Sequence, residues 1–166
     1  MGKYTLLYNT AQIEYTGNDE VEIGKIVDTE GRILGEHQGL HLFTMGQRKG
    51  HGIASPREGI AYVVVGKDVK RNFLILGYEE ASTRGLYASH AVVGGISNTL
   101  SPLPPRVMAQ PRYRAKAEWA ACEYLEEGRV RLSFETPLRA LAVGQVCAFY
   151  DGGKLLGGGF FESIEP

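Results

Sequence analysis

The sequence predicts an all-β, mainly β-strand protein built from two successive units. Glycine accounts for 22 of the 166 residues, about 13% against a typical value of about 7%, and seven prolines accompany it. Short apolar runs bounded by turn residues recur along the chain, and no long helix is indicated. Short strands with frequent turns are typical of all-β architectures.

Residues 22–82 are expected to form a small β-rich central domain, preceded by a lead-in of residues 1–21. The turn residues Thr29-Glu30-Gly31 separate two strand-like runs and indicate a hairpin. A short helical turn is expected at residues 37–41. The strand-like runs are residues 4–8 and 12–16 in the lead-in, and residues 24–28, 32–35, 61–65 and 72–76 in the domain.

Residues 83–166 are expected to form the second unit, with an irregular Pro-rich connection at residues 98–105. Five strand-like runs joined by short turns follow and indicate a closed barrel or a sandwich. Gly157-Gly158-Gly159 lacks the following helix and lysine of a phosphate loop, so it is expected to allow close packing or a bulge. The five runs are residues 107–110, 112–119, 129–134, 145–150 and 155–162.

The charge and apolar pattern exclude several classes of protein. The formal net charge is −1, so any RNA contact has to come from a local basic patch, and DNA is not expected as a partner. No apolar run approaches the roughly 18 residues that cross a bilayer, and no signal peptide is visible. These features predict a cytoplasmic protein without membrane contact.

Neither the cysteines nor the histidines predict a metal site. Cys122 and Cys147 are the only two cysteines; they lack Cys-x-x-Cys spacing, and both are expected to be structural. His37, His41 and His51 show no zinc spacing and are expected at the surface or bonded to the backbone.

A glycine-rich basic segment is the first candidate site. Arg48 and Lys49 lie between Gly46 and Gly50, beside Gln47. Glycines let the backbone approach another group closely, the two cations suit phosphate or carboxylate, and the amide can both donate and accept. On these residues alone, a surface turn with two solvated cations is the more common structure.

The second candidate site is Arg112-Tyr113-Arg114, with Gln145 as a third position. Alternation along an expected strand places both arginines on one face, where they can bind phosphates while Tyr113 stacks on a base. The alternative is an exposed ion-paired strand with a core tyrosine. Gln145 follows Gly144 at a turn, where it can bond a ribose or a phosphate or act as an ordinary turn residue.

Longer ordered strings of motifs add to these local patterns. In order they are Gly24-Lys-Ile-Val-Asp28, Thr44-Met-Gly-Gln-Arg-Lys-Gly50, Val64-Val-Gly-Lys-Asp68, Arg112-Tyr-Arg114, Arg129-Val-Arg-Leu-Ser-Phe134, Gly144-Gln145, Phe149-Tyr-Asp-Gly152 and Leu156-Gly-Gly-Gly159. Over roughly residues 22–165 the chain resembles the central and C-terminal domains of the tRNA-specific 2-thiouridylase family, once named as a methyltransferase. The resemblance implies a six-stranded C-terminal barrel similar to the second domain of elongation factor Tu.

The resemblance also implies roles for the candidate residues. Arg112 and Tyr113 match a tRNA-contacting pair, Arg114 adjoins them, and the family equivalent of Gln145 touches tRNA. Arg48 and Lys49, with Gln47 beside them, either contact RNA or brace the interface with a catalytic domain.

The family places sulfur on C2 of the wobble uridine, by ATP- and magnesium-dependent adenylation and then attack by a cysteine persulfide. Both steps belong to an N-terminal domain with a Ser-Gly-Gly-x-Asp-Ser loop, and neither that loop nor the sulfur-handling cysteines occur in this sequence. The chain is therefore expected to be the tRNA-positioning half of the enzyme or a standalone relative of it, with no catalytic residue, metal or bound cofactor of its own.

The residues leave two alternatives to tRNA positioning. A methyltransferase is disfavoured because no strand, Gly-rich loop and helix unit is present to hold a nucleotide-like cofactor. A protein-interaction barrel that docks a sulfur carrier or a partner subunit is the other alternative.

Overall fold

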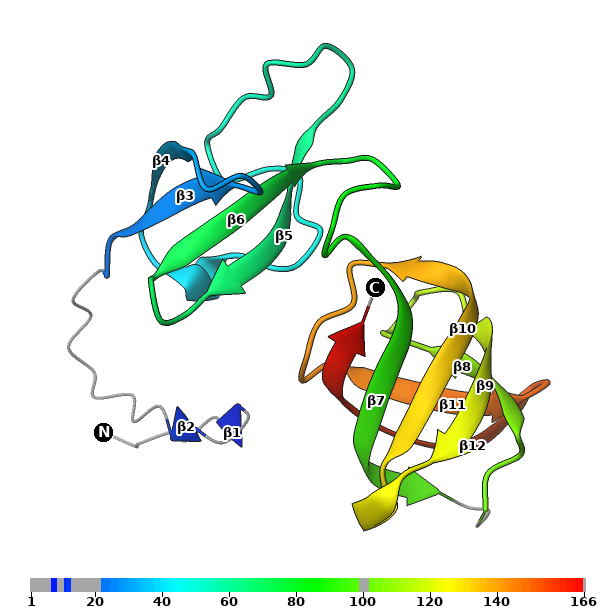
Figure 1. The fold of residues 1–166 in the computed structure, drawn as a ribbon. Coiled ribbons are helices and arrows are strands. Elements are labelled where there is room, and N and C mark those ends of the chain that lie inside the picture. Colours follow the sequence, from blue (N-terminus) through cyan, green and yellow to red (C-terminus); the bar gives the residue numbers. More distant parts are fainter. Residues whose placement is uncertain (1–6, 9–10, 13–21, 99–101, 166) are drawn as a thin grey trace.

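The computed structural model describes residues 7–8, 11–12, 22–98 and 102–165 (Figure 1). Strands β1 (Leu7–Tyr8) and β2 (Ala11–Gln12) pair antiparallel; the remaining positions of the two strands expected in the lead-in, residues 4–6 and 13–16, lie outside the described part of the chain. Among the described residues the only helices are two 3-10 turns, and no helix is long and apolar enough to cross a membrane.

The first domain is a four-stranded sheet in the order β4-β3-β6-β5. The expected hairpin is confirmed by the antiparallel pairing of β3 with β4, whereas β3 and β6 run parallel. The expected helical turn is a 3-10 helix, η1, three residues later than its predicted start. The bounds are β3 Gly24–Asp28, β4 Ile33–His37, η1 Leu40–Leu42, β5 Tyr62–Asp68 and β6 Phe73–Tyr78.

Apolar side chains from β3, β5, β6 and the loop after η1 form the core of this domain. Ile26, Val64, Leu74 and Leu76 are almost completely buried, together with Phe43. The alternating exposure along β6 places Leu74 and Leu76 on the same face of the sheet, as strand geometry requires. This packing explains why the valine-rich and leucine-rich runs predicted strands correctly.

The second domain is a closed antiparallel barrel in the order β10-β7-β12-β11-β8-β9 (Figure 1). The closed six-stranded barrel implied by the resemblance is confirmed, and closure leaves no unpaired sheet edge of the kind that a sandwich would have. The bounds are β7 Tyr87–Asn98, β8 Arg106–Gln110, β9 Glu118–Tyr124, η2 Glu126–Gly128, β10 Val130–Arg139, β11 Val146–Asp151 and β12 Lys154–Glu165.

Strand β7 was absent from the strand-like runs of the sequence. The glycine pair Gly94-Gly95 and the polar Ser89-His90 interrupt its apolar alternation, and glycine weakens a strand signal. In the barrel Gly94 has a packing role, because a Cβ there would clash with the Glu162 carboxylate of β12, and a Cβ at Gly159 of β12 would lie 2.5 Å from the Gly94 carbonyl oxygen. The close packing and bulge expected at Gly157–Gly159 are confirmed by this approach and by a register shift between Gly158 and Phe160.

Both cysteines are free thiols that serve the barrel core. Burial raises the pKa of Cys122 to about 11 and, helped by the neighbouring Cys122, that of Cys147 to about 12. A thiol with so high a pKa is a poor nucleophile and metal ligand. The structural role expected for the two cysteines therefore agrees with their surroundings.

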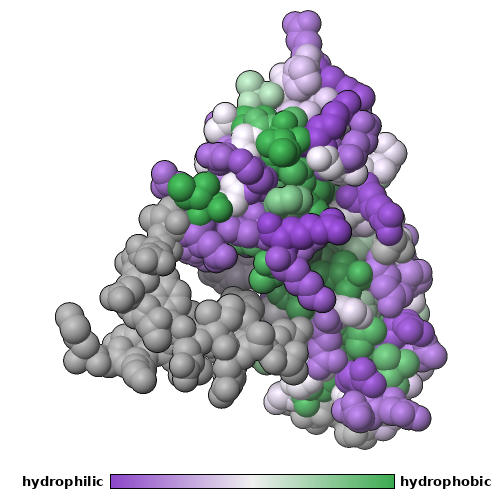
Figure 2. All heavy atoms as spheres, turned by 60° about the vertical axis from the view of Figure 1, so that its left-hand side comes forward, coloured by the Kyte–Doolittle hydropathy of each residue, from purple (hydrophilic) through white to green (hydrophobic). Residues whose placement is uncertain are grey.

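The molecular surface is mixed in character. Figure 2 shows green apolar side chains interspersed with purple hydrophilic ones on the face that it presents. Exposed apolar side chains of the barrel include Val146 and Phe160, which are direct cross-strand neighbours on β11 and β12.

Candidate nucleic-acid interface

The glycine-rich basic segment pairs with the free edge of strand β5. The Gly46 N–H donates to the Val64 carbonyl oxygen at 2.7 Å, and the Val64 N–H donates to the Gln47 carbonyl oxygen at 3.0 Å. Gly46 has a φ of +76°, which favours glycine. A Cβ at this position would lie 2.5 Å from the Ala140 Cβ of the barrel. The close approach expected of this glycine is therefore made to the second domain of the same chain.

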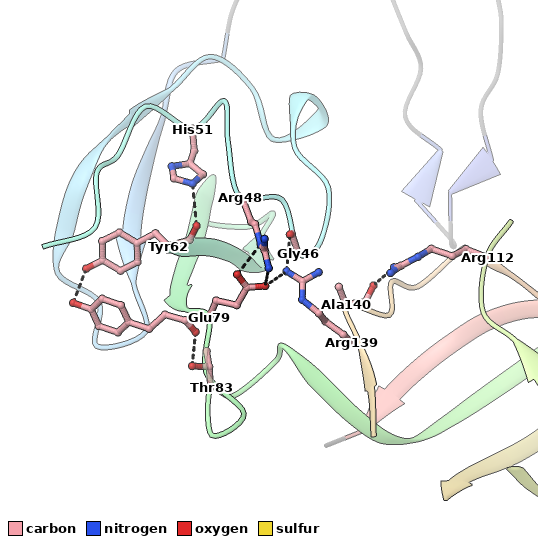
Figure 3. Close-up of polar contacts among 10 residues, drawn as sticks. Gly46, Arg48, His51, Tyr62, Glu79, Thr83, Arg112, Arg139 and Ala140 are labelled. Carbon is pink, nitrogen blue, oxygen red and sulfur yellow. Dashed lines mark hydrogen bonds and ion pairs between the residues drawn. The ribbon is translucent and has the colours of Figure 1, made fainter. Parts of the chain in front are cut away.

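A carboxylate beside this contact joins the two domains (Figure 3). Glu79 Oε2 lies 2.6 Å from Arg48 Nε, and Oε1 accepts from Arg48 Nη2 and from Arg139 Nη2, each at 2.7 Å. Arg139 Nη2 also donates to the Gly46 carbonyl oxygen at 3.1 Å. Hydrogen bonds from Arg48 and Arg139 outweigh burial and hold the pKa of Glu79 below its ordinary value.

Apolar side chains of both domains form a shared cluster beside the ion pairs. Val63 and Val65 of β5 pack with Leu86 and with Ala140, which follows β10. The Ala140 N–H donates to the Leu86 carbonyl oxygen at 2.7 Å. We call this contact, formed by residues 44–50, 79–86 and 139–140, the interdomain joint.

Arg112, Tyr113 and Arg114 do not lie on a strand, so the prediction that both arginines share one strand face is wrong. Strand β8 ends at Gln110 and β9 begins at Glu118. Pro111 follows β8 and has no N–H for the sheet ladder, and Arg114 adopts a φ of +64° in the turn that results.

The turn directs these three side chains differently. Arg112 Nη1 donates to the Ala140 carbonyl oxygen at 3.1 Å, so this arginine contacts the interdomain joint from the barrel side (Figure 3). Tyr113 is 85% exposed and is therefore not the core tyrosine of the alternative interpretation. The Arg114 guanidinium lies 5.2 Å from the centroid of the Tyr113 ring.

The two glutamines are bonded within their own turns. Gln47 Oε1 accepts the Thr44 N–H at 3.0 Å, and its Nε2 donates to the Lys49 carbonyl oxygen at 2.7 Å. Gln145 Oε1 accepts the Ala142 N–H at 3.2 Å. Both amides thus hold the shape of the segments that carry the cations.

Six of the seven residues predicted as contacts lie in two segments at or next to the interdomain joint, and Gln145 lies in the barrel turn that precedes β11. The first segment carries Gln47, Arg48 and Lys49, and the second carries Arg112, Tyr113 and Arg114. In the described part of the chain, the side chains of Lys49 and Arg114 have no carboxylate partner. The arrangement therefore places cations with free donors on both domains.

Sequence reasoning missed two residues of the joint, Glu79 and Arg139. They are separated by 60 positions, and an ion pair over that distance leaves no local pattern. The pair Arg139-Ala140, at the end of β10, is part of the sequence that resembles the 2-thiouridylase family, and this resemblance was the available signal.

The described residues contain no cluster of potential metal ligands. Among them no group of three His, Cys, Asp or Glu side chains could hold a metal ion. His37 and His51 are buried, each with Nε2 facing a backbone carbonyl oxygen and Nδ1 accepting a backbone N–H. The glycine run at Gly157–Gly159 lies within strand β12 rather than in a phosphate loop.

Comparison with known proteins identifies the family of each of the two domains. Residues 14–78 match the family model "tRNA methyl transferase PRC-barrel domain", and residues 84–161 match "Aminomethyltransferase beta-barrel domain". The first matched segment contains the strands of the sheet domain, and the second contains most of the closed barrel. The chain is thus a PRC-barrel-type β-domain followed by a β-barrel domain.

The curated relatives specify the family. The chain is 89% identical over 143 residues, 86% of its length, to tRNA-specific 2-thiouridylase MnmA of Akkermansia muciniphila. It is 39% identical over 156 residues, 92% of its length, to the protein of that name from Moorella thermoacetica, and 41% identical over 151 residues, 90% of its length, to that from Acetivibrio thermocellus. The chain belongs to the tRNA-specific 2-thiouridylase family. It spans 40 to 42% of the length of these relatives.

Proposed function

We propose that this chain is the tRNA-binding and tRNA-positioning part of a tRNA-uridine 2-sulfurtransferase that thiolates C2 of the wobble uridine. The observation that carries the proposal is that six of the seven predicted contact residues lie at or next to the interdomain joint, in two segments far apart in sequence. In this proposal residues 22–82 and 83–166 are the two domains, acting in the cytoplasm.

The chemistry of the joint suits an RNA backbone. Guanidinium and ammonium groups bind phosphate through charge-assisted hydrogen bonds, and such contacts position an RNA without reading its sequence. Lys49 and Arg114 offer exposed cations, and the exposed ring of Tyr113 offers a surface on which an unpaired base can stack.

The sulfur transfer itself is assigned to the part of the relatives that this chain does not span. That part would bind ATP and magnesium, activate the uridine carbonyl by adenylation and carry the cysteine persulfide. The role of this chain is to hold the tRNA so that the wobble uridine reaches that centre. Orientation of a bound substrate is a large component of catalysis in general.

The test is a salt titration of binding between this chain and a tRNA that reads Lys, Glu or Gln codons. The double variant Arg112→Ala with Arg114→Ala is compared with Arg71→Ala with Arg129→Ala, a control that removes the same charge elsewhere. Arg71 and Arg129 are paired with the nearby Asp68 and Glu127.

Each lost phosphate contact is expected to reduce the slope of log affinity against log salt by about one. The Arg112 and Arg114 double variant should therefore bind more weakly, with a slope lower by up to about two, while the control keeps the native slope. Equal slopes in the two double variants would contradict the assignment of this turn to RNA binding.

A protein partner is the second candidate, favoured by the exposed pair Val146 and Phe160 on the outer face of the barrel. If the chain binds no tRNA at low salt but binds a sulfur-carrier protein, the interaction-barrel alternative is supported instead.

A further inference from the structure

The linker between the two domains begins with a residue that contacts both of them. Strand β6 ends at Tyr78 and β7 begins at Tyr87, so Glu79 is the first linker residue. Its carboxylate accepts from Arg48 of the sheet domain and from Arg139 at the end of β10 in the barrel (Figure 3). A single side chain thus connects loop, linker and barrel.

The geometry of this connection is restrictive. Arg48 approaches Glu79 through both Nε and Nη2, at 2.6 and 2.7 Å, and such bidentate pairs fix direction as well as distance. Glu79 is only 16% exposed at its side chain and Arg139 30%, so water screens the contact less than it screens a surface pair. Without the carboxylate, two guanidinium groups would face each other.

The rest of the linker is folded back on the sheet domain. The Glu79 N–H donates to the Ala61 carbonyl oxygen at 2.9 Å, and the Thr83 hydroxyl donates to the Tyr78 carbonyl oxygen at 2.6 Å. Gly85 lies so close to β5 that a Cβ there would be 2.6 Å from the Val65 carbonyl oxygen. These contacts hold the linker against the sheet domain, so the linker cannot rearrange freely when Glu79 is replaced.

We propose that Glu79 is a positioning residue that locks the orientation of the barrel relative to the sheet domain. The RNA consequence rests on the proposed function: the cations of the two domains then stand at a fixed separation, so that their contacts with one tRNA add together. Contacts that act on one ligand at a fixed spacing gain affinity from each other, and this gain is lost when the spacing is not maintained.

The neighbouring carboxylate supplies a matched control. Glu80 pairs with Arg57 at 3.3 Å, and both residues belong to the sheet-domain side of the joint. Glu79→Gln and Glu80→Gln each remove one negative charge while keeping the size of the side chain. Only Glu79→Gln removes an ion pair that crosses between the domains.

The first measurement is the set of NMR residual dipolar couplings of the full chain in the wild type and both variants. We expect one common alignment tensor for the two domains in the wild type and in Glu80→Gln, and two different tensors in Glu79→Gln. Good fits within each separate domain show that the variant is folded. A common tensor retained in Glu79→Gln overturns the proposal.

The second measurement is tRNA affinity at fixed salt. Charge alone predicts that both variants bind RNA more tightly, because each is more positive by one. If Glu79 locks the orientation of the two domains, Glu79→Gln should instead bind tRNA at least about tenfold more weakly, although this variant retains every RNA donor. If no form of the chain binds tRNA, the proposed function fails while the dipolar couplings still decide the role of Glu79.

Discussion

Replacement of Gly46 by alanine tests whether the two domains are packed as tightly as the structure indicates. A new Cβ at this position would lie 2.5 Å from the Ala140 Cβ and 2.8 Å from Arg139 Nη1. The backbone at Gly46 also has a φ of +76°. The substitution therefore combines local backbone strain with a clash across the interdomain joint.

Gly52 allows the two effects to be separated. It lies in the same loop with a φ of +75°, but a Cβ there would meet nothing within 4 Å. The left-handed conformation costs an L-residue about 1–2 kcal/mol in both variants. Overpacking adds about 1–3 kcal/mol in Gly46→Ala alone, so the difference between the two variants isolates the clash.

The assay is urea unfolding followed by tryptophan fluorescence. Trp119 is the single tryptophan and lies on β9 of the barrel, in the other domain from both mutated loop positions. We expect Gly46→Ala to lower the free energy of unfolding reported by Trp119 by about 1–3 kcal/mol more than Gly52→Ala does. Equal shifts in the two variants would refute the inferred packing of the joint.

Three further predictions concern the interiors of the domains. Gly159→Ala is expected to destabilise the barrel by about 1–3 kcal/mol, because its Cβ would lie 2.5 Å from the Gly94 carbonyl oxygen; Gly153→Ala, which meets nothing within 4 Å, should leave the urea midpoint unchanged or raise it. Native Cys122 and Cys147 should not react with a thiol reagent at pH 8, because burial raises their pKa values to about 11 and about 12; rapid labelling without denaturant would contradict this. Asp28 is buried, but hydrogen bonds from the Arg32 side chain and from backbone N–H groups outweigh burial and lower its pKa. Asp28→Asn should therefore cost the sheet domain about 1–2 kcal/mol at neutral pH, and the difference from the wild type should vanish as the pH falls through the lowered pKa. Thermal unfolding followed by tyrosine circular dichroism at several pH values measures this, and a difference that persists in acid would count against it.

Local sequence patterns were sufficient for elements that are stabilised by neighbours in the chain. The β3–β4 hairpin depends on a four-residue connection, residues 29–32, and the runs at β5 and β6 bury apolar side chains on one sheet face. Strand β7 was missed because its glycines serve a contact with β12, more than 60 residues later. The strand expected at Arg112 was wrong because Pro111 ends the ladder that the alternation of side chains implied.

Some features of the candidate site also follow from the local sequence, whereas others depend on the tertiary structure. By itself, the sequence determined the all-β class and the residue types suited to phosphate, because both follow from composition and local residue chemistry. Only the tertiary structure decided that Arg48 faces Glu79 and Arg139, and that Arg112 turns toward Ala140. The physical reason is that ion pairs and close backbone approaches depend on the distance in space between segments, and barrel closure and domain docking set that distance.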